Sequence, residues 1–476
     1  MVQLSTFALA ASIVGAGAVT LAPQEPGVEP KVIQGDIQRR RVENPLERDR
    51  LRRKQSKTVF ESLTNEETLY FANVTMGTPS QSLRLHIDTG SSDLWVNVAN
   101  SKLCESRGNP CAFAGTYNPN ASSTYHYVNS EFNITYVDGS GSVGDYATDS
   151  VTIGGVTLQS QEFGIGYSST SQEGIMGIGY TLNEAILAVP GAQPYVNLPL
   201  NMMQSGYINA NAYSLWLNDL DASTGSILFG GVDTDKYTGT LEAVPIIKEQ
   251  GVYAEFIIGL TAVGFNGNQG SIANNLNTPA LLDSGSSLMY LPNNVASQIY
   301  SMTGAQYNSQ EGAAFIDCAQ AYNSTTIDFT FSSPTISVAM SELVIVAGIE
   351  GNKEVCILGI APADGTTPVL GDTFLRSAYV VYDMQNNEIA LAQTNFNATS
   401  SNIQEITNAT STSGGIPGAS VVANAVTSVS VASGGARLQG VTITSTAGVA
   451  PATPAPRQFA FGAAVAAAGA GLMMAI

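Results

Sequence analysis

The chain has 476 residues, 44% of them apolar, which is enough for two or three domains with a large buried core. It carries 38 acidic and 19 basic residues, a formal net charge of −19. Residues 1–57 hold 10 of the basic and 6 of the acidic residues, so the rest of the chain has a formal charge of −23. Such an acidic body repels nucleic acid, which argues against a nucleic-acid-binding function. Below about pH 4 most carboxylates are neutral, so the composition suits an acid-adapted protein as well as an ordinary soluble one.

Residues 1–18 are predicted to be a secretory signal peptide. Leu4–Val19 is apolar and rich in Ala and Gly, and Ala16-Gly17-Ala18 resembles a signal-peptidase site. The segment has no Lys or Arg, so only the amino terminus supplies the usual positive charge. A disordered Ala-rich tail is the alternative.

Residues 19–57 are predicted to be a propeptide. Arg39-Arg40-Arg41 and Arg52-Arg53-Lys54 are candidate sites for a protease that cleaves at dibasic sequences. A basic segment can lie in the cleft of an acidic body at neutral pH, and protonation of the carboxylates would weaken that attraction. A charged, solvated linker is the alternative.

Short runs of alternating apolar and polar residues predict a mostly β protein. Examples are Leu83–Ile87, Val151–Ile153 and Tyr213–Leu217, which lie among clusters of Gly, Asn, Asp and Ser. Helical patterns are few and short, with candidates at Tyr180–Ala188 and Asn294–Met302.

The most specific signal is a pair of Asp-Thr/Ser-Gly-Ser-Ser segments, which begin at Asp88 and Asp283 after apolar runs. One such segment alone is an ordinary turn. Here, however, an apolar pair and a glycine follow each Asp at nearly the same distance, with Gly177 at +89 and Gly371 at +88. A glycine in a strand suits a place where another backbone passes close by. The chain therefore contains a duplicated lobe, which predicts two similar β lobes with a cleft between them.

At these residues the chain resembles the pepsin-like aspartic proteases, over about Tyr70 to Gln393. The resemblance implies a bilobal pepsin-like fold, protein and peptide substrates, and neither cofactor nor metal. Further segments resemble the family's passage between lobes and its closing strands: Tyr213–Leu217, Gly225–Asp233, Tyr237–Leu241, Val380–Asp383 and Asn386–Leu391.

The resemblance implies that Asp88 and Asp283 are the catalytic pair. Two carboxyl groups held together share one proton, because two like charges cannot both ionise cheaply. The ionised member would take a proton from a bound water and the protonated member would polarise the scissile carbonyl, with titration belonging to the pair. Ser91 and Ser286 would hydrogen-bond the outer carboxylate oxygens, or else merely cap the turns. The other motif residues expected to support the pair are Thr89, Gly90, Ser284 and Gly285.

Tyr136–Ser140 resembles the family's flap, a hairpin tip that closes over the substrate. The hydroxyl of Tyr136 would meet the indole N–H of Trp95. Asp138, followed by Gly139, would favour substrates with Lys or Arg in the adjacent pocket. With the tail described below, this acid resembles the yapsin-like fungal proteases, whereas an ordinary Asp-Gly hairpin turn is the alternative.

The four cysteines are expected to form disulfides, which a secreted context favours over free thiols. Three pairings are possible, and the resemblance implies Cys104–Cys111 and Cys318–Cys356. The short loop between the first pair lacks the long insertion of some yapsins. Sequons for N-glycosylation, of which only some should be used, begin at Asn73, Asn120, Asn133, Asn323, Asn397 and Asn408.

After about Asn397 the composition shifts to Ser, Thr, Ala, Gly and Val, which predicts a flexible stalk. Phe459–Ile476 is apolar and uncharged. A small-residue site near Gly448, a spacer and this tail together indicate a GPI-anchor signal. A single membrane-spanning helix and a soluble tail are the alternatives.

The sequence thus predicts a monomeric, acid-acting aspartic endopeptidase, made as a zymogen. It would follow the secretory pathway to the outer face of the plasma membrane or the cell wall, held by a lipid anchor. The alternatives are a soluble secreted protease of broad specificity, a catalytically inactive peptide-binding relative and a stalked adhesin. The expected parts are the signal peptide 1–18, the propeptide 19–57, the N-terminal lobe 58–240, the C-terminal lobe 241–397, the stalk 398–457 and the attachment signal 458–476.

Overall fold

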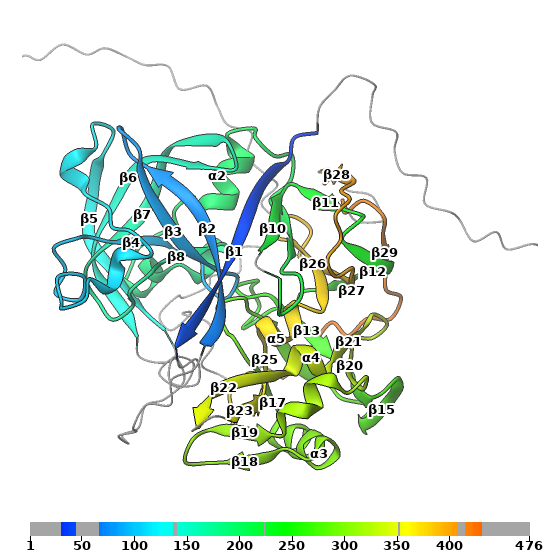
Figure 1. The fold of residues 1–476 in the computed structure, drawn as a ribbon. Coiled ribbons are helices and arrows are strands. Elements are labelled where there is room, and N and C mark those ends of the chain that lie inside the picture. The colour runs from blue at the N-terminus through cyan, green and yellow to red at the C-terminus, as the bar shows by residue number, and fades with distance from the viewer. Residues whose placement is uncertain are drawn as a thin grey trace, which may run out of the picture. The chain divides into compact units, whose positions relative to one another are not determined.

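The structure is a computed structural model that describes residues 30–43, 66–136, 140–222, 224–350, 353–407 and 415–430. Strands predominate, as predicted (Figure 1). Strand β3 (Gln81–Asp88) shows the expected alternation in its first half, because Leu83 and Leu85 are buried while Ser82 and Arg84, which precede them, are exposed. Its last residues are buried on both faces, where the strand enters the core.

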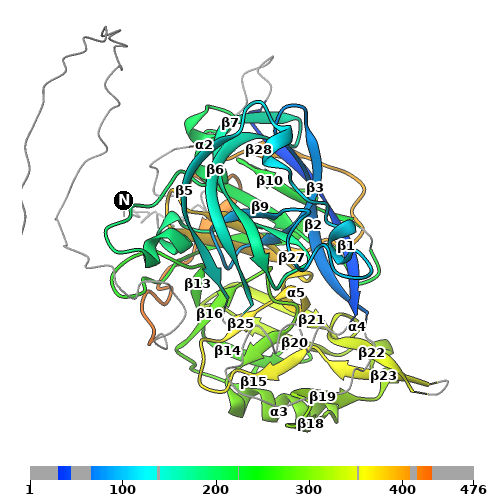
Figure 2. The same ribbon diagram turned by 90° about the vertical axis from the view of Figure 1, so that its left-hand side faces the viewer.

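The largest sheet in the described residues has fourteen strands and joins the N-terminal lobe to the strands between the lobes. Figure 2 shows its strands β5, β6 and β7 side by side. In spatial order the strands are β29 (Ala419–Val421), β12 (Tyr237–Pro245), β27 (Glu388–Thr394), β26 (Ala378–Asp383), β9 (Ala212–Trp216), β10 (Thr224–Phe229), β1 (Ile33–Glu43), β2 (Glu66–Met76), β3, β8 (Gly174–Gly177), β4 (Leu94–Asn97), β7 (Val156–Ser169), β6 (Gly141–Ile153) and β5 (His126–Thr135).

The C-terminal lobe is built from smaller sheets. In the described residues these contain β13 (Ile257–Leu260), β16 (Thr278–Leu282), β25 (Val369–Leu370), β17 (Met289–Leu291) and β24 (Ile360–Pro362); β15 (Asn268–Ala273), β14 (Ala262–Phe265), β20 (Thr326–Thr330) and β21 (Thr335–Ala339); and β18 (Gln306–Asn308), β19 (Ala313–Ile316), β23 (Lys353–Leu358) and β22 (Val344–Glu350). A further pair joins β11 (Gly231–Asp233) to β28 (Ile403–Glu405).

Helices are short, as the sequence indicates. The described helices are α2 (Leu198–Gln204), α3 (Asn293–Thr303), α4 (Met340–Leu343) and α5 (Asp372–Leu375). The predicted helix at 294–302 is α3. The predicted helix at 180–188 is instead two 3-10 turns, Thr181–Asn183 and Ala185–Ala188, because the backbone of Glu184 between them is extended.

The same strand arrangement occurs once in each lobe. Strand β3 runs parallel to β8, which pairs antiparallel with β4. In the second lobe β16 runs parallel to β25, which pairs antiparallel with β17. The glycines of the repeat stand where backbones pass closely, since a Cβ on Gly177 would lie 2.6 Å from the Asp93 nitrogen and a Cβ on Gly371 would overlap the Ser286 carbonyl.

Strand β1 lies within the segment expected to be a propeptide. It pairs antiparallel with β10 through Gln38 and with β2 from Ile37 onward, and Figure 1 shows it between these strands. Its apolar residues Ile33 and Ile37 are fully buried and belong to the main core. The backbone of Arg39-Arg40-Arg41, one candidate processing site, is therefore hydrogen-bonded into a sheet.

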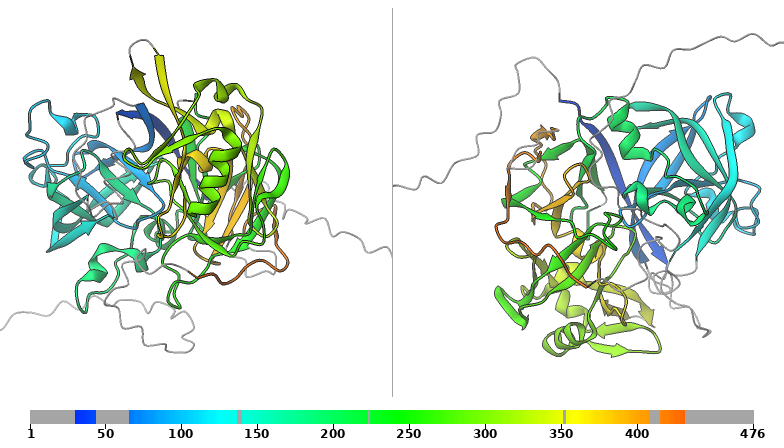
Figure 3. Two further views of the ribbon diagram at one scale, coloured as in Figure 1. Left: turned by 90° about the horizontal axis from the view of Figure 1, so that it is seen from below. Right: turned by 180° about the vertical axis from the view of Figure 1, so that it is seen from behind.

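The chain beyond Asn397 differs from the expected stalk over residues 398–407 and 415–430. Strand β28 pairs antiparallel with β11, and β29 pairs in parallel with β12. Residues 415–430, which contain β29, are the orange segment of the chain in Figures 1 and 3. Ile406, Ile416 and Ala419 are buried against the strands between the lobes. These few apolar side chains, spaced along a Ser/Thr-rich segment, are the physical reason that it folds onto the body.

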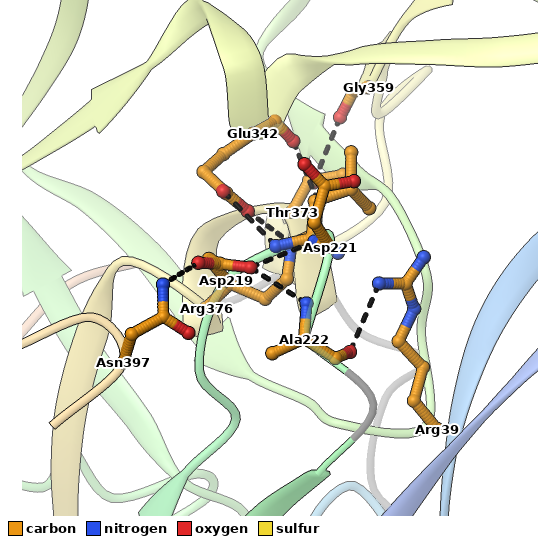
Figure 4. A network of polar contacts seen from close by, with 10 residues as sticks. Arg39, Asp219, Asp221, Ala222, Glu342, Gly359, Thr373, Arg376 and Asn397 are labelled. Carbon is orange, nitrogen blue, oxygen red and sulfur yellow. Dashed lines mark hydrogen bonds and ion pairs between the residues drawn. The ribbon is translucent and has the colours of Figure 1, made fainter. Parts of the chain in front are cut away.

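A polar network that contains a buried ion pair ties β1 to the C-terminal lobe (Figure 4). Arg39 donates from Nη1 to the carbonyl of Ala222 at 3.2 Å. In the same turn the N–H of Leu220 donates to Glu342 Oε1 at 3.2 Å. Glu342 also forms an ion pair with Arg376, at 2.6 Å between Oε2 and Nε, with both side chains buried. Removal of either partner would leave an unpaired buried charge, so this pair is expected to hold the turn in place.

Candidate active site

The two predicted aspartates lie at the ends of equivalent strands. Asp88 is the last residue of β3, and Asp283 directly follows β16. Main-chain bonds fix both positions, because the Asp88 carbonyl accepts from Ile178 N at 3.0 Å and Asp283 N donates to the Leu370 carbonyl at 3.2 Å. Asp88 is buried and Asp283 is partly buried.

Reciprocal hydrogen bonds lock the two turns together. Thr89 Oγ1 donates to the carbonyl of Leu282 at 2.8 Å, and Ser284 Oγ donates to the carbonyl of Ile87 at 3.0 Å. Each hydroxyl also accepts from the other turn's main chain, at 2.9 Å from Ser284 N and 3.2 Å from Thr89 N. All four bonds are buried, so they hold the turns in a fixed relation across the junction of the lobes.

Each carboxylate has the same pair of donors. Oδ1 of Asp88 accepts from Gly90 N at 2.9 Å and its Oδ2 accepts from Ser91 Oγ at 2.5 Å. Oδ1 of Asp283 accepts from Gly285 N at 2.8 Å and its Oδ2 accepts from Ser286 Oγ at 2.6 Å. The bonds predicted for the two serines are therefore present, and they fix the plane of each carboxyl group.

Glycine is required where each turn meets the opposite carboxylate. A Cβ on Gly90 would lie 2.5 Å from Asp283 Oδ1, and a Cβ on Gly285 would collide in the same way with Asp88 Oδ1. Each aspartate thus faces the other turn's glycine with no side chain between. Both carboxyl groups therefore lie at the junction of the two turns.

The hairpin predicted to be a flap is formed by β5 and β6, and the Tyr136 N–H donates to the Ser140 carbonyl at 2.8 Å across its base. The indole Nε1–H of Trp95 donates to the Tyr136 hydroxyl at 2.8 Å, as expected. Trp95 is fully buried, so the bond anchors the tyrosine to the body of the lobe. Asp138 and Gly139 lie outside the described residues.

An acidic cluster behind the first turn was not predicted from the sequence. Asp93 is buried and accepts from the hydroxyls of Tyr146 at 2.9 Å and Tyr195 at 3.1 Å. Glu184 is also buried, and its Oε2 accepts from the N–H of Tyr195 at 2.7 Å. Burial, together with the negative charge of Asp93, raises the pKa of Glu184 to about 10. One sequence signal was available, because Asp93 is five residues after Asp88 where the second lobe has Leu288.

The remaining predicted residues are placed as follows. Cys104 is bonded to Cys111 and Cys318 to Cys356, the pairing that the resemblance implied. Asn408 and Gly448 lie outside the described residues. The other sequon asparagines have exposed side chains: Asn73, Asn120, Asn133, Asn323 and Asn397.

Comparison with known proteins agrees with this geometry. Residues 69–394 match the model of the family described as eukaryotic aspartyl protease. The probable aspartic-type endopeptidase opsB of Aspergillus oryzae is 51% identical over 454 residues, which cover 91% of this chain and 93% of the relative. Secreted aspartic protease 4 of Candida albicans is 38% identical over 345 residues, which cover 71% of this chain and 79% of the relative.

A solved structure supports the fold. The crystal structure of aspartic proteinase from Irpex lacteus superposes with a TM-score of 0.59 at 22% identity, over 78% of this chain and 100% of that chain. At this identity the likeness shows the fold alone. The match over residues 69–394 and the identity to the fungal relatives show more: the chain belongs to the eukaryotic aspartyl protease family and is an aspartic-type endopeptidase.

Proposed function

We propose that Asp88 and Asp283 hold a water molecule between them and use it to hydrolyse peptide bonds at acidic pH. The observation that carries this proposal is the placement of each carboxylate against the opposite turn's glycine, with matched donors on each. Two carboxyl groups brought together in this way would hold one proton between them, an effect for which aspartic proteases are the standard example.

The pair then acts as both base and acid. The ionised carboxyl takes a proton from the water, whose oxygen attacks the scissile carbonyl carbon. The protonated carboxyl gives its proton to the carbonyl oxygen. The carboxyl that took the proton of the water then passes it to the amide nitrogen as the C–N bond breaks. Ser91 and Ser286 keep the outer oxygens occupied, so the shared proton and the water are directed to the inner side. Closure of the flap over the peptide would exclude bulk water.

Isosteric replacement of either aspartate tests this mechanism. Asp88→Asn and Asp283→Asn each remove one carboxyl group, so kcat on a peptide library near pH 4 should fall by about 10²–10⁴-fold. Thermal unfolding of both variants should show that they are folded. A folded variant that keeps most of the wild-type kcat would contradict the dyad mechanism. A wild-type protein that binds peptides but cleaves none would favour the inactive peptide-binding alternative.

The proposed preference for basic residues rests on Asp138 at the flap tip. A carboxylate beside the substrate would pair with Lys or Arg, whereas a plain turn residue would not discriminate. Asp138→Thr should lower cleavage beside Lys and Arg selectively in the same peptide library. An equal loss for all peptides would remove Asp138 as a specificity determinant.

We also propose a secreted zymogen that is carried to the cell surface by a lipid anchor. The apolar tail 458–476 and the signal-like residues 1–18 support this proposal. Among the described residues no helix is both long and apolar enough to cross a membrane. Phosphatidylinositol-specific phospholipase C should release the protein from intact cells. Protein already free in the medium would favour the soluble, broadly specific alternative.

A further inference from the structure

The first catalytic turn has a side-chain contact that the second turn lacks. Asn183 donates from Nδ2 to the carbonyl oxygen of Gly90 at 3.2 Å. Asn183 is 5% exposed and Gly90 is partly buried, so the bond has little access to solvent. In the part of the chain that the structure describes, no side chain donates to the equivalent carbonyl of Gly285. The donor to this carbonyl is therefore one respect in which the first turn differs from the second.

Asn183 is held rigidly on both sides. Its own N–H donates to the Tyr180 carbonyl at 2.9 Å, which closes the 3-10 turn Thr181–Asn183. Two residues later, Ala185 N donates to Asp93 Oδ2 at 2.8 Å. Glu184 between them is fixed by its bond from Tyr195 N. The buried acidic cluster thus sets the position from which the amide of Asn183 reaches the catalytic turn.

The carbonyl that Asn183 contacts belongs to the peptide group between Gly90 and Ser91. The plane of that peptide sets the position of Ser91, whose hydroxyl donates to Asp88 Oδ2 at 2.5 Å. The following carbonyl, of Ser91, accepts from Gly179 N at 2.9 Å. A peptide group held by a buried donor cannot rotate without breaking that bond.

We propose that Asn183 is a positioning residue for the peptide-hydrolysis reaction. It fixes the Gly90–Ser91 peptide, and through Ser91 it orients the Asp88 carboxylate, with no counterpart at Asp283. This inference rests on the proposed catalytic pair. It predicts that loss of the amide N–H lowers kcat and leaves KM nearly unchanged, because Asn183 orients a reacting group and need not bind the peptide.

The decisive variant is Asn183→Leu, which keeps nearly the shape of the asparagine side chain and has no N–H to donate. We expect its kcat to be about tenfold lower than that of the wild type, the loss typical of one hydrogen bond, with KM within about twofold. The kcat of Asn183→Ala should be lower by a similar factor.

Asn395→Leu is the matched control, since Asn395 Nδ2 also donates to a main-chain carbonyl, that of Asp235, at 2.9 Å, but outside the catalytic machinery. Its kcat and KM should equal those of the wild type. A folded Asn183→Leu whose kcat stays within about twofold of the wild type, or whose KM changes as much as its kcat, would overturn the proposal. Failure of the dyad itself would appear separately, as cleavage by Asp88→Asn. If Asn183→Ala does not fold, the kcat and KM of Asn183→Leu alone decide.

Discussion

At the scale of single residues, Glu184 shows how burial controls an acidic side chain near the site. The side chain is fully buried, and burial with the nearby charge of Asp93 raises its pKa to about 10 from an ordinary value of 4.5. The folded protein therefore holds this proton where the unfolded chain would release it. This stabilisation of the folded protein is complete at pH values below the ordinary pKa. It is lost progressively as the pH rises toward the pKa of the folded state.

Glu184→Gln tests this effect, because a neutral amide of the same shape cannot ionise. The free energy of unfolding of the wild type should fall relative to that of the variant as the pH rises from about 5 to about 8, by up to about 1.4 kcal/mol per pH unit. Urea unfolding across this range measures the difference. Glu131→Gln, at an exposed position, is the control. Its free energy of unfolding should change with pH as that of the wild type does. A parallel curve for Glu184→Gln would mean that Glu184 ionises in the folded protein as it does when unfolded.

The residues that the sequence revealed and those that it hid differ in kind. Asp88, Asp283 and their serines stand in repeated motifs whose spacing is visible without a structure. Asn183 and Glu184 stand in no motif. Asn183 donates to Gly90, 93 residues earlier in the chain, and Glu184 lies in the field of the Asp93 charge. Their importance depends on burial and on hydrogen bonds across the lobe, which no local pattern records.

At the scale of elements, the strands of the two lobes were predictable and the two terminal segments were not. Alternating apolar residues and the duplicated motifs indicated β3 and β16 directly. Strand β1 is rich in Arg, which indicated a propeptide, and the segment 398–430 is rich in Ser and Thr, which indicated a flexible stalk, so composition predicted a strand in neither. In each segment two or three buried apolar residues and the pairing of its backbone with an existing strand are sufficient for folding.

Ile406 tests whether the segment after Asn397 belongs to the folded body. Its side chain is fully buried beside β28, and its N–H donates to the Gly230 carbonyl at 2.8 Å. Ile406→Ala should lower the free energy of unfolding by about 2–5 kcal/mol, because a buried cavity replaces the removed methyl groups. Val421→Ala in β29, where the side chain is 52% exposed, should stay within about 0.5 kcal/mol of the wild type. Equal small effects for both would indicate that the segment only rests on the surface.

At the scale of the whole molecule, buried carboxyl groups and net charge both lower the stability of the folded protein as the pH rises. Burial is the first cause that raises the pKa of each of several acidic residues, which are Glu162, Glu184, Glu249, Asp383 and Glu388. For Glu388, burial and then the charge of Asp383 raise the pKa to about 7. The body after residue 57 also carries a formal charge of −23 at neutral pH, so its folded state repels itself.

The whole protein is therefore expected to be more stable at about pH 5 than at about pH 8, and salt separates the two causes. Each carboxyl group with a raised pKa contributes stability that is complete at pH values below its pKa in the unfolded chain. That contribution is lost as the pH rises through its pKa in the folded protein. Raising NaCl from about 0.1 M to about 1 M shortens the Debye length from about 10 Å to about 3 Å, which screens surface repulsion and leaves the cost of burial. Urea unfolding at both pH values and both salt concentrations should show a loss toward pH 8 that salt reduces but does not abolish. If the loss of unfolding free energy toward pH 8 vanishes in high salt, net charge alone causes it. A higher unfolding free energy at pH 8 than at pH 5 would contradict both causes.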